Sequence, residues 1–201
     1  MDGGRQPKGA DSTAATQVRA SWAKTLVASA KRARATQPEI LAAIDGEVRR
    51  RVRGAAKLGW IDAGDMTAIA RSIHDAVGPA RARSFWRGCM TMAIDTPLLS
   101  PLKAGAFSLF GRDPYKILRM TPRVWDLLIR GGGSLECSRL GDAGARFDMA
   151  DLALEFRQHP VFLDMVAGAA ETMIDQCDRE GTASVLHADP DTGRATIDIL
   201  W

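Results

Sequence analysis

The segment 110–147 constrains the fold more than any other part of this 201-residue chain. Asp113 and Pro114 open it, and these residue types suit a helix N-cap and first helical turn. Apolar residues at helical spacing follow and predict an amphipathic helix that ends at the glycines of 131–133. Alternating apolar and polar residues on both sides of the turn at 141–144 then predict a β-hairpin. The segment therefore reads as a helix that leads into a hairpin.

The last third of the chain repeats this plan. His159 and Pro160 precede a predicted helix at 161–179, for which Gly181 is the expected C-terminal stop. The turn residues of 189–193 separate a strand that begins near residue 185 from a strand with alternating apolar residues at 197–201. Two hairpins, each fed by a helix, predict a four-stranded antiparallel sheet packed against helices. The expected fold class is α/β of the α+β type.

Everything before the organising segment reads as helical. Apolar residues recur at helical spacing in four stretches, which we predict as helices at about 15–35, 38–53, 62–77 and 79–94. Asp62 is the expected N-cap of the third helix, and a further apolar segment follows at 97–110. Residues 1–14 have no apolar pattern and are expected to be disordered. We therefore expect one helical-plus-sheet domain over 15–201.

Composition indicates a globular protein that works in the cytoplasm. The chain is 46% hydrophobic and 25% charged, which are ordinary globular values. No run approaches the roughly 18 apolar residues that a membrane span requires. The polar N-terminal segment also lacks the apolar core of a secretory signal. We therefore expect a cytoplasmic protein without a membrane span.

The charge is distributed unevenly along the chain. Residues 1–57 hold 12 Lys/Arg and 5 Asp/Glu, a net charge of +7. Residues 58–201 hold 15 Lys/Arg and 19 Asp/Glu, a net charge of −4. The densest cations form a basic patch that comprises Arg49, Arg50, Arg51, Arg53 and Lys57. Such a run favours a solvated helix face, or contact with an acidic protein or nucleic acid. Because no aromatic residues are interleaved with it, nucleic acid is the less favoured partner.

The residues that carry catalytic or metal chemistry are few and scattered. The three histidines are His74, His159 and His187, and the three cysteines are equally far apart. No closely spaced pair suggests a zinc site, and no nucleophile has an evident base. The glycine-containing segments 111–114 and 131–134 fit the capping of a helix and a turn better than they fit a phosphate-binding loop. We therefore expect a protein that is not an enzyme and has no catalytic residues and no metal site.

The segment 85–110 is more apolar than a single amphipathic helix requires. It fits a pair of core helices, a pocket wall or a dimer face, and methionine suits each of these. The residues that we assign to a ligand pocket or interface are Phe85, Trp86, Met90, Leu99, Leu102, Phe107, Phe110 and Trp125. If the segment makes a dimer, Phe107→Asp or Phe110→Asp should dissociate it.

Three segments carry a resemblance to a known family. They are GWIDAGDMTAIARSIHDAVG at 59–78, LFGRDPYKILRMTPRVWDLLIRGG at 109–132, and the closing IDILW at 197–201. Together, over about residues 15–201, they resemble a family of unknown function that is expanded as paralogues in myxobacteria. That family is similar to a superfamily of haem-based nitric-oxide-binding domains, vinyl-reductase-like small-molecule-binding domains and TRAPP subunits. The resemblance implies helices over a four-stranded sheet with an apolar pocket between helices.

The resemblance does not extend to the haem site. The haem-binding members use a proximal histidine and a Tyr-x-Ser-x-Arg pattern that holds the propionates. Here Tyr115 and Arg119 have the required spacing, but Ile117 stands where serine is needed. We therefore expect no cofactor.

The preferred hypothesis is a non-enzymatic sensor or adaptor domain that binds a small apolar ligand or a partner protein. The alternatives are a homodimeric interaction or scaffolding module, and a nucleic-acid-associated protein that uses the basic N-terminal helices.

Overall fold

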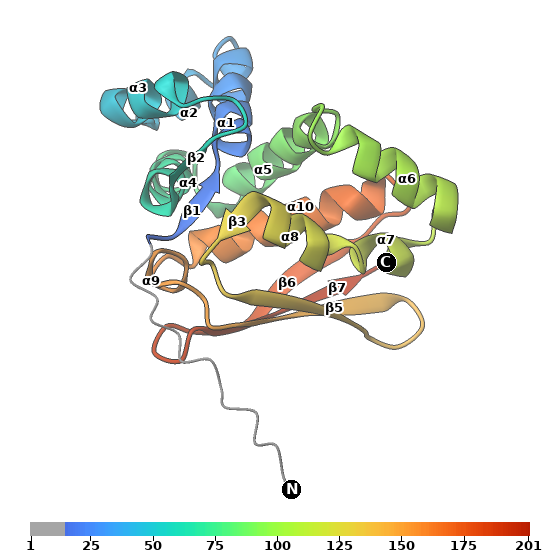
Figure 1. Ribbon diagram of the computed structural model, residues 1–201. Helices are drawn as coiled ribbons and strands as arrows, with labels where there is room; N and C mark the ends of the chain where they lie inside the picture. The colour runs from blue at the N-terminus through green and yellow to red at the C-terminus, as the bar shows by residue number, and fades with distance from the viewer. Residues whose placement is uncertain (1–14) are drawn as a thin grey trace, which may run out of the picture.

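The computed structural model describes residues 15–201, so the predicted disorder of 1–14 lies outside the described residues. A four-stranded sheet forms one layer, and α10 runs across it beneath α5 (Figure 1). Helices α6, α7 and α8 cover the rest of that side of the sheet, and α1–α4 gather at one end of the molecule with a second, smaller sheet (Figure 1). The predicted α+β class, with helices packed against an antiparallel sheet, is confirmed.

The elements follow one another in chain order with short connections. The helices are α1 (Ala20–Ala33), α2 (Pro38–Ala43), α3 (Gly46–Gly54), α4 (Ala63–Val77), α5 (Pro79–Ile94), α6 (Ser100–Phe110), α7 (Pro114–Leu118), α8 (Thr121–Leu128), α9 (Leu154–Arg157) and α10 (Val161–Asp175). The strands are β1 (Gln17–Arg19), β2 (Trp60–Asp62), β3 (Ile129–Arg130), β4 (Ser134–Arg139), β5 (Gly144–Ala150), β6 (Thr182–Asp189) and β7 (Arg194–Leu200).

The four-stranded sheet consists of the two predicted hairpins. Its order is β4-β5-β7-β6, with every pair antiparallel, so the hairpins meet where β5 pairs with β7. Alternation places Phe147 and Ile197 directly opposite each other on the buried face. On the other face Arg146 donates to both carboxylate oxygens of Asp198, at 2.7 and 2.9 Å. The sheet therefore has one apolar side, and the helices cover that side.

Helices α5 and α10 form the packed centre of the helical layer. A Cβ added to Gly168 would lie 3.2 Å from the Cβ of Trp86, so the absence of a side chain lets the two helices approach closely. Glu171 of α10 is 7% exposed and accepts a hydrogen bond from the backbone N–H of Ala183, the second residue of β6. Its carboxylate also lies 3.6 Å from a guanidinium nitrogen of Arg83 on α5. These contacts fix α5, α10 and β6 to one another.

The N-terminal third is not purely helical, which corrects the prediction. A helix was expected at 15–35, but residues 17–19 form β1 and the helix begins at Ala20. Strand β1 pairs with β2 on one side and β3 on the other to make a three-stranded antiparallel sheet. The guanidinium groups of Arg19 and Arg130 both lie against the ring of Trp60, at 3.9 and 4.0 Å. This small sheet joins the N-terminal helices to the start of the hairpin region.

The single helix predicted at 38–53 is two helices. Helix α2 ends at Ala43, and Asp45 caps α3 by accepting hydrogen bonds from the N–H groups of Glu47 and Val48, at 2.8 and 3.0 Å. These bonds lower the pKa of the Asp45 carboxyl because they stabilise its charged form. The apolar spacing of 38–53 is satisfied by two separate helices, which the periodicity alone did not reveal.

The helix predicted from Asp113 to the glycines of 131–133 is also two helices, α7 and α8, and β3 follows α8 before the glycines. The other helix predictions differ less from the structure. The N-cap at Asp62 and the helix at 79–94 are confirmed, as is Asp113 as the cap of α7. Helix α10 ends at Asp175, before the predicted residue 179, and the turn after it places Asp178 at a positive φ of 56°. Helix α9 was not predicted, because its four residues are too few to show a period. Among the described helices, none combines the length and apolar character that crossing a membrane requires.

Candidate functional site

Two adjoining cavities lie between the helices on the apolar side of the sheet. The first, which we call the Trp125 chamber, has a volume of about 70 Å³ and lies among α1, α5, α8 and α10. The second, the Met173 chamber, has a volume of about 100 Å³ and lies among α5, α6, α8 and α10, above Phe147 of β5. Their walls share Met90, Leu99, Thr121, Val124, Val166 and Ala169. A few side chains therefore separate the two spaces.

Helix α10 shows where its packing gives way to the chambers. Most of its residues are buried, but Ala169 and Met173, one turn apart, are partly exposed and line the chambers. An alanine side chain is too short to reach across the space, so Ala169 leaves room that a larger residue would fill. Methionine is flexible and polarizable, and Met90 and Met173 can therefore adjust to occupants of different shape. The wall is apolar and adaptable.

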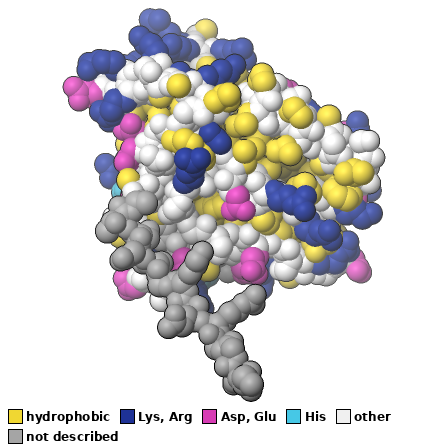
Figure 2. Space-filling model, viewed as in Figure 1, with side chains coloured by type: hydrophobic (Ala, Val, Ile, Leu, Met, Phe, Trp, Pro, Cys, Tyr) yellow, Lys and Arg dark blue, Asp and Glu magenta, His cyan; other side chains and the backbone are white. Residues whose placement is uncertain are grey.

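Helix α6 covers the Met173 chamber but is held loosely. Of the eleven residues of this helix, all of them described, only Ala106 is buried. Leu99, Leu102 and Ala106 face the chamber. Leu109 on the same helix is 77% exposed. In Figure 2, hydrophobic side chains collect over the side of the molecule where α6 and α8 lie, with Lys and Arg side chains among them. Helix α6 is therefore the chamber wall that costs least to move.

The rim of the Met173 chamber carries two cations. Lys103, in the first turn of α6, donates to a carboxylate oxygen of Asp95 at 2.6 Å, which offsets its charge. Arg123, in the first turn of α8, is exposed, and its guanidinium has no ion-pair or hydrogen-bond partner among residues 15–201. The walls of both chambers lack Asp, Glu, His, Cys and Tyr within the described residues. An apolar space thus opens beside an uncompensated positive charge.

An aromatic cluster supports the inner end of the Trp125 chamber. Phe156 and Phe162 stack with ring centroids 3.9 Å apart, and Trp125 packs edge-on against both, at 6.2 and 6.0 Å. The indole N–H of Trp125 donates to the carbonyl of Gly133 at 3.1 Å. That bond ties α8 to the loop before β4, so this wall of the chamber is rigid.

The structure divides the residues that were assigned to a pocket or interface. Met90 and Leu99 line both chambers, while Trp125 and Leu102 each line one. Trp86 is 2% exposed and lies in the core, where it packs edge-on against the half-buried Phe85. Neither of these two aromatic residues is part of the chamber walls in the described chain.

The two phenylalanines of α6 have a different place. Phe107 and Phe110 are half-buried and pack with Ala106, Ile117 and Cys177 in a small cluster separate from the main core. A charge at either position would therefore disturb the seating of α6 itself. Leu109 on the same helix is the more exposed of its two exposed leucines.

Sequence reasoning missed the α10 side of the chambers. Val166, Ala169 and Met173 follow the helical spacing that also marks a core-facing stripe, and a cavity wall has the same composition as a filled core. Arg123 was missed because it directly follows a proline and resembles an ordinary surface cation. No sequence signal marks these residues as chamber residues.

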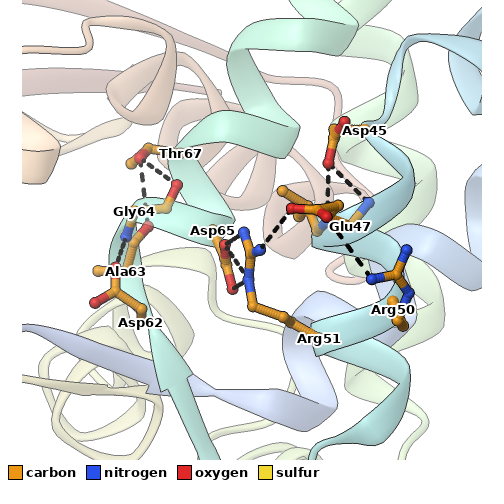
Figure 3. A network of polar contacts seen from close by, with 10 residues as sticks. Asp45, Glu47, Arg50, Arg51, Asp62, Ala63, Gly64, Asp65 and Thr67 are labelled. Carbon is orange, nitrogen blue, oxygen red and sulfur yellow. Dashed lines mark hydrogen bonds and ion pairs between the residues drawn. The ribbon is translucent and has the colours of Figure 1, made fainter.

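The basic patch at 49–57 does not act as a unit. Arg51 points to α4, where its Nε and a terminal nitrogen donate to Asp65, the latter at 2.6 Å (Figure 3). Arg50 lies 3.8 Å from Glu47 in the preceding turn. Arg53 and Lys57 are exposed at the end of α3 and beyond it. One arginine of the run therefore joins two helices, Arg49 is half-buried, and the other cations remain exposed.

The cysteines are not poised as nucleophiles. Burial raises the pKa of Cys89 to about 12, and burial also raises that of Cys137 and Cys177 to about 11. A thiol attacks as the thiolate, so all three are weak nucleophiles near neutral pH. Within residues 15–201, no three His, Cys, Asp or Glu side chains come together to hold a metal ion.

Comparison with solved structures identifies chains of similar fold. They include an oxygen-binding H-NOX domain related to soluble guanylate cyclases, with TM-score 0.55, 16% identity and 90% of each chain covered. An Fe(II) unliganded H-NOX protein mutant from K. algicida has TM-score 0.62 and 7% identity over 90% of this chain and 95% of its own. A mutant H-NOX of T. tengcongensis has TM-score 0.53 and 15% identity over 88% and 95%.

The chain has an H-NOX-like fold. The expected relation to haem NO-binding domains is confirmed at the level of fold. No family model matches the sequence, and no curated protein does. At 7–17% identity the likeness is one of architecture, so the properties of the site must be argued from the residues present.

Those residues do not fit a haem group. Of the three histidines, His74 lies beside Asp75 near the end of α4, His159 lies in the loop before α10, and His187 lies on an exposed part of β6. None of them lines either chamber within 15–201. Tyr115 lies under the guanidinium of Arg139 instead of facing the space. Chambers of about 70 and 100 Å³ are also small beside the roughly 300–1,000 Å³ typical of cofactor pockets.

Proposed function

We propose that this chain is a ligand-binding module of H-NOX-like fold that holds a small apolar molecule in the Trp125 and Met173 chambers. The adjoining apolar chambers carry the proposal. A dry apolar cavity of about 150 Å³ is enough to bind benzene, and chambers of about 70 and 100 Å³ would together reach that size if a ligand displaced their shared side chains. The ligand would therefore be about the size of a six-carbon chain or a single ring.

On this proposal the chain acts by binding and not by catalysis. The chamber walls of the described chain offer no carboxylate, imidazole, thiol or phenol that could serve as base or nucleophile. Helix α6 is the element through which occupancy would be sensed, because it contributes to the wall and packs least. A sensor or adaptor role in the cytoplasm, and kinship to the myxobacterial family named above, belong to the same proposal.

The first experiment asks whether the chambers take up a ligand. Native mass spectrometry and an absorption spectrum of gently purified protein would report a co-purified molecule. The stripped protein is then melted with 1-hexanol, and saturation at about 100 times Kd should stabilise it by about 2.7 kcal/mol. Ala169→Leu, which adds carbons to both chambers, should abolish the shift. Ala42→Leu on the exposed face of α2 is the matched control and should keep it.

A result in which Ala169→Leu and wild type respond equally to 1-hexanol would contradict the proposal, because binding would then lie elsewhere. A Soret band in the purified protein would contradict the exclusion of haem. Either outcome is visible in the same sample.

A second candidate function is self-association or partner binding through α6. Leu109 is 77% exposed and Leu102 is 39% exposed, and large exposed leucines on one helix favour a covered surface. The molecular mass in solution tests this idea. A dimer that Leu109→Glu dissociates would support it, and a monomer at all concentrations would exclude self-association. Leu109 is a better site than Phe107 or Phe110, which also seat the helix.

A further inference from the structure

We infer that the ligand of the Met173 chamber is an amphipathic organic anion, with an oxyanion head at Arg123 and an apolar tail in the chambers. This inference rests on the proposed function and adds the chemical class of the ligand. The apolar walls alone would favour any small hydrocarbon. The rim supplies the information that distinguishes one class from another.

Arg123 is the residue that carries the argument. It belongs to the chamber lining, yet it is exposed and its guanidinium has no partner in the described chain, so it lies where the chamber meets solvent. A guanidinium presents paired N–H donors that match the two oxygens of a carboxylate or a phosphate. The cation at the mouth is therefore available to a ligand, whereas most other arginines on the helices near the chamber are already engaged.

Lys103 of α6 supplies a second, masked positive charge at the rim. Its ammonium group is held 2.6 Å from Asp95, and the lysine side chain is 28% exposed. The first turns of both α6 and α8, which carry these two cations, contain no acidic residue. An anion at the mouth would thus meet one free cation and one paired cation, without a carboxylate in either first turn.

The chemistry of the rim also disfavours the other ligand classes. A cationic amphiphile would place its charge beside Arg123, where like charges repel. A neutral alcohol would fill the chambers but leave the guanidinium as it is in the free protein, in contact with water. An oxyanion head gains the charge-assisted hydrogen bonds that neither of the others can make.

The test compares ligands that share one tail. Hexanoate, monohexyl phosphate, 1-hexanol and hexylamine are titrated into the full chain at low salt and near neutral pH, and Kd is measured by calorimetry. We expect at least one of the two anions to bind about tenfold more tightly than 1-hexanol, and hexylamine to bind most weakly. Hexanoate and monohexyl phosphate separate a carboxylate head from a phosphate head. The preference for the anion should shrink as salt is raised.

Two substitutions at the rim should move the preference in opposite directions. Arg123→Gln should reduce the ratio of anion affinity to 1-hexanol affinity to about one. Asp95→Asn frees Lys103 and should raise anion affinity about threefold or more. Arg53→Gln removes the same charge from α3, which does not line the chamber, and is the control that should leave the Kd of both the anions and 1-hexanol unchanged.

The outcomes separate this inference from the proposed function. If 1-hexanol binds as tightly as both anions, or if Arg123→Gln keeps the preference, the head-group assignment is overturned while the chambers remain the site. If none of the four probes binds, or if Ala169→Leu leaves their binding unchanged, both the inference and the proposed function fail.

Discussion

Substitution of Ala169 by leucine tests directly whether the space between α10 and α8 is real. The residue lines both chambers, whose volumes are about 70 and 100 Å³. Leucine adds three carbon atoms, and burying each contributes about 0.8 kcal/mol, or about 2.4 kcal/mol in all. Ordering the leucine side chain costs about 0.5–1 kcal/mol. The net expectation is that the ligand-free protein becomes more stable by about 1.5–2 kcal/mol.

The cavity volume gives a similar estimate of how much Ala169→Leu should stabilise the protein. Residual cavities in protein cores destabilise by about 24 cal/mol per Å³. Filling a chamber of 70 to 100 Å³ would therefore recover about 1.7–2.4 kcal/mol before the entropy of the new side chain is subtracted. For a chain of this length, 1.5–2 kcal/mol corresponds to a rise in melting temperature of about 3–8 °C. That shift is well within the resolution of calorimetry or circular dichroism.

The sign of the change decides the matter. If the region were already filled, leucine would be forced into a packed core, and overpacking costs about 1–3 kcal/mol. Native mass spectrometry must first show that the sample carries no bound molecule, because a tightly held ligand would produce the same destabilisation. A ligand-free protein that melts at a lower temperature with Ala169→Leu would refute the chambers. Ala42→Leu should stay within about 0.5 kcal/mol of wild type.

Three further predictions concern the frame around the site. Gly133→Ala should cost about 2–4 kcal/mol, since φ is +85° and a Cβ would lie 2.5 Å from the Ala150 carbonyl, whereas Gly141→Ala, with φ +60° and no neighbour within 4 Å, should cost only about 1 kcal/mol by urea unfolding. At pH 8, Cys89 should react with iodoacetamide roughly a thousandfold more slowly than the thiol of an unfolded chain, because its pKa of about 12 lies three units above the ordinary cysteine value of 9.0. Mass spectrometry of the alkylated protein measures this rate. Between pH 9 and 12 the thiol is protonated in the folded state but ionised in the unfolded state, so its contribution to the free energy of unfolding falls as the pH rises through that range. Asp45→Ala should lower the melting temperature by about 2–4 °C at pH 7, and the difference from wild type should shrink as pH falls below 3.8, because the lowered pKa of Asp45 stabilises the fold only where the carboxyl is charged.

The parts of the fold that the sequence predicts are those with a long, regular pattern. The hairpins around 141–144 and 189–193 combine turn residues with alternating strands, and the helix at 79–94 combines a proline start with a sustained apolar stripe. Strands β1 and β2 have three residues each and were absorbed into neighbouring patterns, because alternation over three residues is indistinguishable from part of a helix. Their pairing depends on contacts distant in sequence, such as Val18 with Ile61.

The candidate site was predictable on one side only. Met90 and Leu99 were singled out because their segment is richer in apolar residues than one helix face needs. Ala169 was not, because a small residue on a buried helix signals close packing as readily as empty space. Which reading is right depends on the distance between helices, and local sequence does not encode that distance. Arg123 became informative only when its position at the chamber mouth was known.

Helices α5 and α10 form the firmly held walls of the chambers, and α6 forms the loosely held one. This difference indicates how ligand binding would change the surface of the protein. Helices α5 and α10 are joined by close packing at Gly168 and by Glu171, which contacts Arg83 and the start of β6. Moving them would break a buried charge network, which costs several kcal/mol. Helix α6 has one buried residue, Ala106, and is seated by the half-buried Phe107 and Phe110, and within the described residues no ion pair joins it to α10 or to the sheet. An occupant that pushes on all walls equally would therefore displace α6 first. Because Lys103 and Leu109 lie on that helix, the same displacement would alter both the rim charge and the exposed apolar surface, so ligand binding and partner binding through α6 would be coupled.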